Sequence, residues 1–221
     1  MITTGVTNSK SAADQRYYSE NYANYEAQTP QNKLNFYVDL VEKWVPKSAK
    51  IFELGVAMGH FFSVITQKYE GAGCDINSYG VDLTRKKCPK SNILLGSYEQ
   101  IKPDLNIGAV VSWDVLEHLP DIDAGLAHIY QNLPAGGRLI AVVPIYDGAL
   151  GWLVRRLDND PTHVTKIGRG DWQRKLTQNG FKIKEFGGIL RKLVGQKYIH
   201  LTQPQALLRH ACSAIYFVAE K

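Results

Sequence analysis

The feature that most constrains the fold is a regular alternation of short apolar segments with amphipathic ones, beginning near residue 49. The apolar segments are almost continuously hydrophobic, as in GRLIAVVP at residues 137–144. Strands of this kind are buried on both faces, inside a mostly parallel sheet covered by helices. The pattern therefore predicts an α/β fold, a doubly wound sheet of seven strands with helices on both faces. The expected strands are residues 49–54, 71–76, 92–97, 107–115, 137–144, 181–186 and 213–221.

The connection that leads to the last strand differs from the others. Residues 181–186 and 213–221 both have a strand pattern, and the sequence between them contains no clear crossover helix apart from a short stretch at 205–210. A parallel neighbour needs a crossover connection, whereas an antiparallel neighbour does not. We therefore expect the last strand to run antiparallel within an otherwise parallel sheet.

Three segments lie outside the alternation. Residues 1–48 are interpreted as an N-terminal helical lid segment that precedes the α/β domain at 49–221. Insertions occupy residues 145–168 and 187–210 of that domain. Ligands of doubly wound sheets bind beyond the carboxyl ends of the strands, and an insertion after the fifth strand would overhang that crevice. Both insertions are interpreted as lid or substrate-pocket material, with simple surface packing as a serious alternative for the second.

Composition limits the class of protein. The 221 residues are 44% hydrophobic and 21% charged, which is ordinary for a soluble globular domain. The three cysteines form no CxxC pair, and no signal peptide or membrane-length apolar segment is visible. We expect a cytoplasmic protein with reduced thiols, without a metal site and without a membrane partner.

The charge distribution bears on possible partners. The net charge is +5, and the basic residues are dispersed rather than gathered in one stripe. No aromatic–basic segment of the kind that binds RNA accompanies them. The pattern favours solvated helix faces over a nucleic-acid surface. We expect a small-molecule substrate and a monomer or homodimer.

A turn of small residues follows the first expected strand, in IFELGVAMGHFF at residues 51–62. A dinucleotide-binding turn would have the pattern G-x-G-x-x-G, but the three positions from Gly55 are Gly55, Ala57 and His60. Glu53 at the end of the strand would repel a pyrophosphate and attract a cationic ligand. S-adenosylmethionine is such a ligand, because it carries an ammonium and a sulfonium but no phosphate.

The order of several motifs between about residues 50 and 186 resembles the class I S-adenosylmethionine-dependent methyltransferases, in their small-molecule branch. FELGVAMG resembles the first motif of that family, with Ala57 in place of the middle glycine. GAGCDINS resembles the end of its second strand, VVSWDVLEHLPD its fourth motif, and NLPAGGRLIAVVP its helix–turn–strand segment. The resemblance implies a Rossmann-like methyltransferase fold and S-adenosylmethionine as cofactor, with S-adenosylhomocysteine as product.

The resemblance also implies the residues that bind the cofactor. Asp75, at the end of the second expected strand, corresponds to the acidic residue that holds both ribose hydroxyls, and a turn cap is its alternative role. Trp113 either stacks on the adenine or fills the core, and Tyr22 either closes over the cofactor or packs a helix on the sheet. The candidate cofactor-binding residues are Glu53, Gly55, Ala57, Gly59, Asp75, Ile76, Ser97, Tyr98, Trp113, Asp114 and Tyr22.

Methyl transfer is an in-line displacement that depends mainly on positioning, but a hydroxyl acceptor must also lose its proton. Two histidines are candidate bases. His118 follows the fourth expected strand, where the crevice should lie, and His163 belongs to the insertion at 145–168. Local hydrogen bonding is the alternative role of His118, and stabilisation of a turn is that of His163.

These observations favour an enzyme that transfers a methyl group to an oxygen or nitrogen atom of a small-molecule metabolite. A methyltransferase acting on RNA or protein is one alternative, and a non-catalytic or NAD-binding Rossmann-like protein is another. The fourth motif lacks the Asn/Asp-Pro-Pro-Tyr signature of methyltransferases that act on DNA bases or glutamine amides. Its absence disfavours those two substrates.

Overall fold

The computed structural model describes residues 29–98, 107–148, 151–158, 160, 162–194, 197–202 and 212–221. Most of the expected N-terminal lid segment, including Tyr22, lies outside the described residues. The predicted role of Tyr22 at the cofactor therefore stays a prediction.

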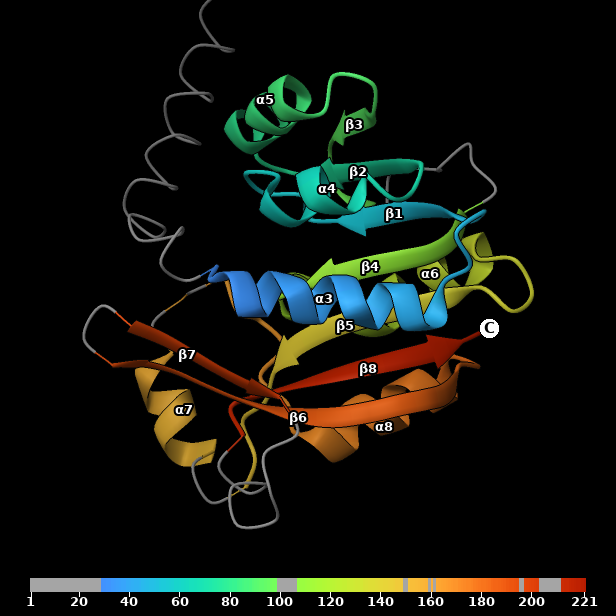
Figure 1. Ribbon diagram of the computed structural model, residues 1–221. Helices are drawn as coiled ribbons and strands as arrows, with labels where there is room; N and C mark the ends of the chain where they lie inside the picture. Colours follow the sequence, from blue (N-terminus) through green and yellow to red (C-terminus); the bar gives the residue numbers. More distant parts are fainter. Residues whose placement is uncertain are drawn as a thin grey trace, which may run out of the picture.

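An eight-stranded sheet with the order β3-β2-β1-β4-β5-β8-β6-β7 forms the centre of the fold (Figure 1). Neighbours among the first five strands are parallel, and the last strand pairs antiparallel with both of its neighbours. The predicted doubly wound α/β fold and antiparallel last strand are confirmed. The strands are β1 (Lys50–Leu54), β2 (Gly71–Asp75), β3 (Asn92–Leu95), β4 (Ile107–Trp113), β5 (Arg138–Pro144), β6 (Lys182–Val194), β7 (Lys197–Thr202) and β8 (Ala214–Glu220).

The sequence predicts seven strands, and the structure adds an eighth within the expected second insertion. β6 continues through Gly187 and Gly188 and then pairs antiparallel with β7. In the sequence the glycine pair resembles a strand end, but in the structure it allows close contact with Tyr216 and Cys212. A Cβ on Gly187 would lie 2.3 Å from the Tyr216 ring, and one on Gly188 would lie 2.5 Å from Cys212 Sγ. Part of residues 187–210 is therefore an extension of the sheet.

Helices cover both faces of this sheet (Figure 1). They are α3 (Gln31–Trp44), α4 (His60–Ile65), α5 (Ser78–Lys87), the short 3-10 helix η2 (Leu116–His118), α6 (Ile122–Asn132), α7 (Gly151–Leu157) and α8 (Arg169–Gln178). Alternate residues of β5 divide between the two cores. Ile140 and Val142 pack with α3 and α4, whereas Leu139, Ala141 and Val143 pack with α6 and α8. None of the described helices is long and apolar enough to cross a lipid bilayer.

The direction of winding reverses between β1 and β4. From β1, the strands β2 and β3 extend the sheet to one side, and β4 and β5 extend it to the other. The carboxyl ends of β1 and β4 therefore meet at a topological switch point, which is where doubly wound sheets bind their ligands. The loops that follow these two strands place the candidate site.

Trp172 of α8 is fully buried, with its ring centroid 6.2 Å from that of Phe217. We predict that Trp172→Ala lowers the free energy of unfolding by about 3–5 kcal/mol, because it removes a large core side chain and leaves a cavity. Urea denaturation followed by circular dichroism measures this loss. Trp152→Ala, at an exposed position of α7, is the matched control and should change the free energy of unfolding by less than about 0.5 kcal/mol. Equal losses in the two variants would contradict this packing.

Candidate functional site

The loop after β1 turns sharply at the switch point. Gly55 has a φ of 77° and Gly59 a φ of 72°, both in the left-handed region that favours glycine. A Cβ on Gly55 would lie 2.4 Å from the Val115 side chain, and one on Gly59 would lie 2.7 Å from the Thr84 hydroxyl. Backbone conformation and packing against two neighbouring segments thus both require glycine at these positions.

Asp75, at the end of β2, is tied to this loop. Its Oδ2 accepts a hydrogen bond from the backbone N–H of Ala57 at 2.8 Å, and its Oδ1 accepts one from the N–H of Asn77 at 2.9 Å. Ala57 has a φ of 46°, a left-handed conformation that glycine adopts more readily than alanine. A carboxylate oxygen accepts more than one hydrogen bond, so these contacts are compatible with further hydroxyl donors from a ligand.

Glu53, near the end of β1, is only 3% exposed. Its Oε2 has no hydrogen-bond partner among the described residues. Burial raises the pKa of Glu53 well above its ordinary value, and the nearby charge of Asp75 raises it further. The residue that the sequence predicts as a negative charge is therefore a buried acid. The ionised form of Glu53 needs a cation beside it.

Apolar side chains are exposed next to Asp75. Ile76 is 70% exposed, and Leu95, the register partner of Asp75 on β3, is 50% exposed. Ser97 follows in the loop after β3 and is partly exposed. An apolar surface beside a carboxylate suits a flat heterocycle that also carries hydroxyl groups.

Two aromatic residues predicted to contact the cofactor pack against other aromatic rings. Tyr98 is buried in the core, with its ring centroid 5.6 Å from that of Phe52. Trp113 of β4 is partly buried and stacks on Tyr37 of α3, with the centroids 4.1 Å apart and the planes within 5°. The Trp113 ring packs against α3, which favours the core-packing alternative, and its predicted contact with the adenine stays a prediction.

Asp114 directly follows β4 and has a φ of 57°. Its Oδ2 accepts a hydrogen bond from Arg191 of β6 at 2.7 Å and lies 4.0 Å from Lys33 Nζ of α3. Burial would raise the pKa of Asp114, but the charges of Arg191 and Lys33 hold it below its ordinary value. Burial also lowers the pKa of Lys33, to about 8. These ion pairs join three elements at the carboxyl end of β4.

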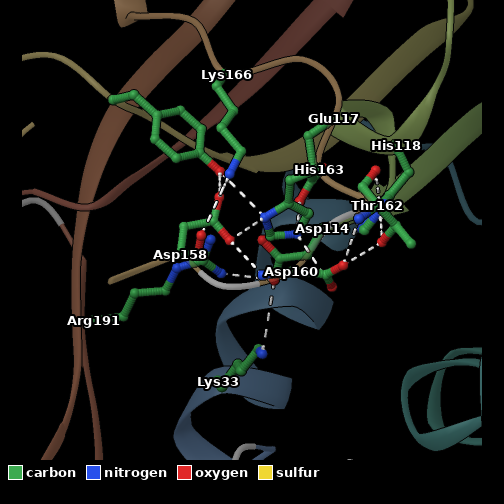
Figure 2. Close-up of polar contacts among 11 residues, drawn as sticks. Lys33, Asp114, Glu117, His118, Asp158, Asp160, Thr162, His163, Lys166 and Arg191 are labelled. Atoms are coloured by element: carbon green, nitrogen blue, oxygen red, sulfur yellow. Dashed lines mark hydrogen bonds and ion pairs between the residues drawn. The ribbon is translucent and has the colours of Figure 1, made fainter. Parts of the chain in front are cut away.

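The two predicted catalytic histidines lie together beyond the same strand end (Figure 2). The rings of His118 and His163 have centroids 4.6 Å apart, although the residues are far apart in the sequence. Glu117, adjacent to His118, lies with its Oε1 3.9 Å from His163 Nε2. Burial raises the pKa of Glu117 well above its ordinary value, and the charge of Asp114 raises it further. We call these three residues the Glu–His–His cluster.

Oxygen atoms of the first insertion hold the Nδ1 atom of each histidine. His118 Nδ1 lies 3.1 Å from the carbonyl oxygen of Thr162 and 2.9 Å from its Oγ1. His163 Nδ1 lies 2.9 Å from Asp158 Oδ1. Burial lowers the pKa of His118, and the neighbouring His163 lowers it further. The segment after β5 thus fixes both ring orientations.

Asp158 is itself held by several donors. The Tyr146 hydroxyl donates to its Oδ2 at 2.6 Å, and Lys166 Nζ lies 2.9 Å from the same atom. Burial would raise the pKa of Asp158, but hydrogen bonds from Tyr146, His163 and Lys166 hold it far below its ordinary value. Asp158 is therefore an ionised carboxylate that accepts the His163 hydrogen bond.

Lys33, Glu117, Asp158 and Arg191 are among the residues of this site that sequence reasoning missed. A carboxylate shortly after an apolar strand and next to a histidine is the signal that could have identified Glu117. Lys33 and Arg191 are ordinary charges of a helix and a strand in the sequence, and only the tertiary structure brings them to Asp114.

A doubly wound sheet with a glycine loop after β1 and an acidic residue at the end of β2 defines the Rossmann-like class of nucleoside-binding folds. A family model described as a methyltransferase domain matches residues 22–185, and the chain belongs to this methyltransferase family. It is an S-adenosylmethionine-dependent methyltransferase, as the sequence resemblance implies.

Solved structures give the same fold. A methyltransferase from Thermotoga maritima, described as a "possible histamine N-methyltransferase", has a TM-score of 0.69 at 15% identity, covering 93% of this chain and 97% of that one. A TehB-like methyltransferase from Corynebacterium glutamicum has a TM-score of 0.64 at 17% identity, covering 95% and 98%. One from Archaeoglobus fulgidus has a TM-score of 0.63 at 16% identity, covering 85% and 94%. A search of curated proteins finds no match.

We predict that Glu53→Gln makes the protein more stable than wild type as the pH rises above the ordinary carboxyl pKa of 4.5. The raised pKa means that the folded state retains a proton that the unfolded state loses, so wild-type stability falls with rising pH in that range. The neutral amide avoids this loss. Urea denaturation across pH, with the exposed Glu70→Gln as control, measures the difference. A variant with the same pH dependence as wild type would contradict the burial of this acid.

Proposed function

We propose that this enzyme methylates an oxygen or nitrogen atom of a small-molecule metabolite. The observation that carries the proposal is the pair His163–Asp158 beside His118, beyond the carboxyl end of β4. Asp158 accepts the Nδ1 hydrogen bond, so the other ring nitrogen of His163 can take a proton from an acceptor. An acceptor hydroxyl or ammonium group needs this proton removal before it can attack.

The residues at the switch point support a cofactor position next to these histidines. The proposed contacts are the Glu53 carboxylate with the methionine ammonium, Asp75 with the ribose hydroxyls, and Ile76 with the adenine. Buried Glu53 needs a cation beside its ionised form, and Ile76 exposes an apolar surface next to Asp75. The Gly55 loop allows a close backbone approach. Tyr98 and Trp113 are left out of this proposed set because Tyr98 is buried in the core and Trp113 stacks on Tyr37 of α3.

When bound, S-adenosylmethionine supplies a methyl group on a positively charged sulfur. The protein's contribution is positioning, exclusion of water and proton removal. Asp114, held by Arg191 of β6 and Lys33 of α3, fixes the start of the loop after β4. His163 is the proposed base, with Asp158 orienting it, and the ring of His118 lies beside that of His163.

The charges around the site support a small acceptor over a nucleic acid. Arg191, Lys166 and Arg169 all follow β5 in the chain, and each forms an ion pair with a carboxylate. Such pairing removes much of the positive potential that a phosphate backbone would need. All three cysteines are buried and form no disulfide, which supports the proposal of a cytoplasmic location.

We predict that Asp75→Ala weakens binding of S-adenosylhomocysteine by about tenfold or more, because it removes the proposed acceptor of the ribose hydrogen bonds. Isothermal titration calorimetry measures the affinity, and the exposed Asp82→Ala in α5 is the matched control. Unchanged affinity in a folded Asp75→Ala protein would refute the ribose contact.

The acceptor class can be tested with a methyl-labelled donor. Purified enzyme is incubated with cell extract that has been separated into metabolite, RNA and protein fractions. The proposal expects label in the metabolite fraction, and label confined to RNA or protein would overturn it.

Once an acceptor is identified, His163→Gln should lower kcat by roughly 10²–10⁴-fold while affinity for S-adenosylhomocysteine stays within about twofold, because the change removes a base and leaves the cofactor loops intact. His128→Gln, in α6, is the control for loss of an imidazole. A His163→Gln enzyme with wild-type kcat would exclude His163 from the reaction.

A further inference from the structure

We propose that the Glu–His–His cluster binds one divalent transition-metal ion beyond the carboxyl end of β4, where the proposed acceptor would lie. Glu117, His118 and His163 each offer one ligand atom, and these atoms all lie within 4.8 Å of one another. Metal–ligand bonds of about 2.0–2.2 Å place neighbouring ligands roughly 3–3.5 Å apart, so small side-chain rotations bring all three onto one ion. The ion's part in methyl transfer rests on the proposed function, whereas its binding does not.

The tautomer of His118 suits a metal ligand. The Thr162 hydroxyl donates its only proton to Asp160 Oδ1 at 2.5 Å, so both Thr162 oxygens act as acceptors toward His118 Nδ1. The ring proton of His118 therefore resides on Nδ1. The Nε2 lone pair of a neutral imidazole remains as the metal ligand.

His163 has the same arrangement. Its Nδ1 donates to the ionised Asp158, which also accepts from Tyr146 and Lys166. Nε2 of His163 consequently presents its lone pair toward Glu117, 3.9 Å away. Metal-binding histidines almost always donate their other ring N–H to a carboxylate or a backbone carbonyl, and both histidines of the cluster do so.

Glu117 gives independent support. Its side chain is 1% exposed, and neither carboxylate oxygen has a hydrogen-bond partner among the described residues. A buried carboxyl group without a hydrogen-bond partner is unfavourable unless a cation or a donor compensates it. Asp160 Oδ2, 3.9 Å from His163 Nε2, adds negative charge nearby. Of the nearby cations, Arg191 forms an ion pair with Asp114, and Lys166 forms one with Asp158.

The donor set indicates the kind of ion. Two imidazoles and one carboxylate without a thiolate suit first-row ions such as Zn²⁺, Fe²⁺, Co²⁺ or Mn²⁺. Three protein ligands leave coordination positions open for an acceptor oxygen. With an ion bound, Nε2 of His163 would be a ligand and no longer the base, and coordination would instead lower the pKa of an acceptor hydroxyl so that it gives its proton to solvent. The site thus selects acceptors with a hydroxyl group that can reach the ion.

The test uses the full chain after treatment with chelator and dialysis. Co²⁺ is titrated in, with visible absorption reporting coordination and calorimetry reporting stoichiometry. We expect one ion per chain, and at least a 100-fold loss of affinity in both Glu117→Gln and His163→Gln. His128→Gln, which removes an imidazole outside the cluster, should bind Co²⁺ like wild type. Circular dichroism confirms that each variant is folded.

Wild-type protein that binds no Co²⁺, or folded Glu117→Gln and His163→Gln variants that bind it like wild type, would overturn the proposed site. Calorimetry with S-adenosylhomocysteine on the metal-free protein distinguishes failure of the proposed metal site from failure of the proposed function. Cofactor binding without metal binding would refute the ion alone, whereas Co²⁺ binding without methylation of any metabolite would refute the proposed function alone.

Discussion

Burial of carboxyl groups at the carboxyl ends of two central strands is the constraint on which the site depends. Glu53 of β1 and Glu117 after β4 lie where water cannot compensate their charge, and Asp114 after β4 is partly buried. A buried carboxyl group either keeps its proton or requires a cation nearby. Asp114 receives cations from the chain itself, through Arg191 and Lys33. Glu53 and Glu117 have raised pKa values, and we propose that ligand cations stabilise their ionised forms.

The topology explains why these acids are close together. The sheet winds outward in two directions from β1 and β4, so the loops after these strands meet at one edge. The steric contact between Gly55 and Val115 is the direct evidence of that meeting. The segments after β5 and within β6 then bring Asp158, His163 and Arg191 to the same edge. The proposed cofactor and acceptor sites thus lie at the same edge of the sheet.

Much of the fold could be predicted from the sequence because strands buried on both faces are continuously apolar, as residues 137–144 are. The glycine loop and Asp75 were also predictable, since their spacing reflects a local strand–turn–helix unit. The extension of β6 was not, because Gly187 and Gly188 resemble a strand end until the neighbouring Tyr216 and Cys212 are known.

The polar site was predictable only in part. His118 and His163 could be selected because few residue types act as bases near neutral pH. Their common position depends on the path of residues 145–168, which no local pattern specifies. Lys33 and Arg191 were missed because a charge on a helix or strand has no distinguishing sequence signal until its partly buried partner, Asp114, is placed beside it.

The most direct test of the central claim is the proton exchange that accompanies S-adenosylmethionine binding, measured by calorimetry in weakly acidic buffers of different ionisation enthalpy. If a cation on the ligand ionises buried Glu53, binding releases a proton from wild-type protein and releases none from Glu53→Gln. Binding that exchanges no proton in the wild type, with the same affinity in the variant, would contradict the account.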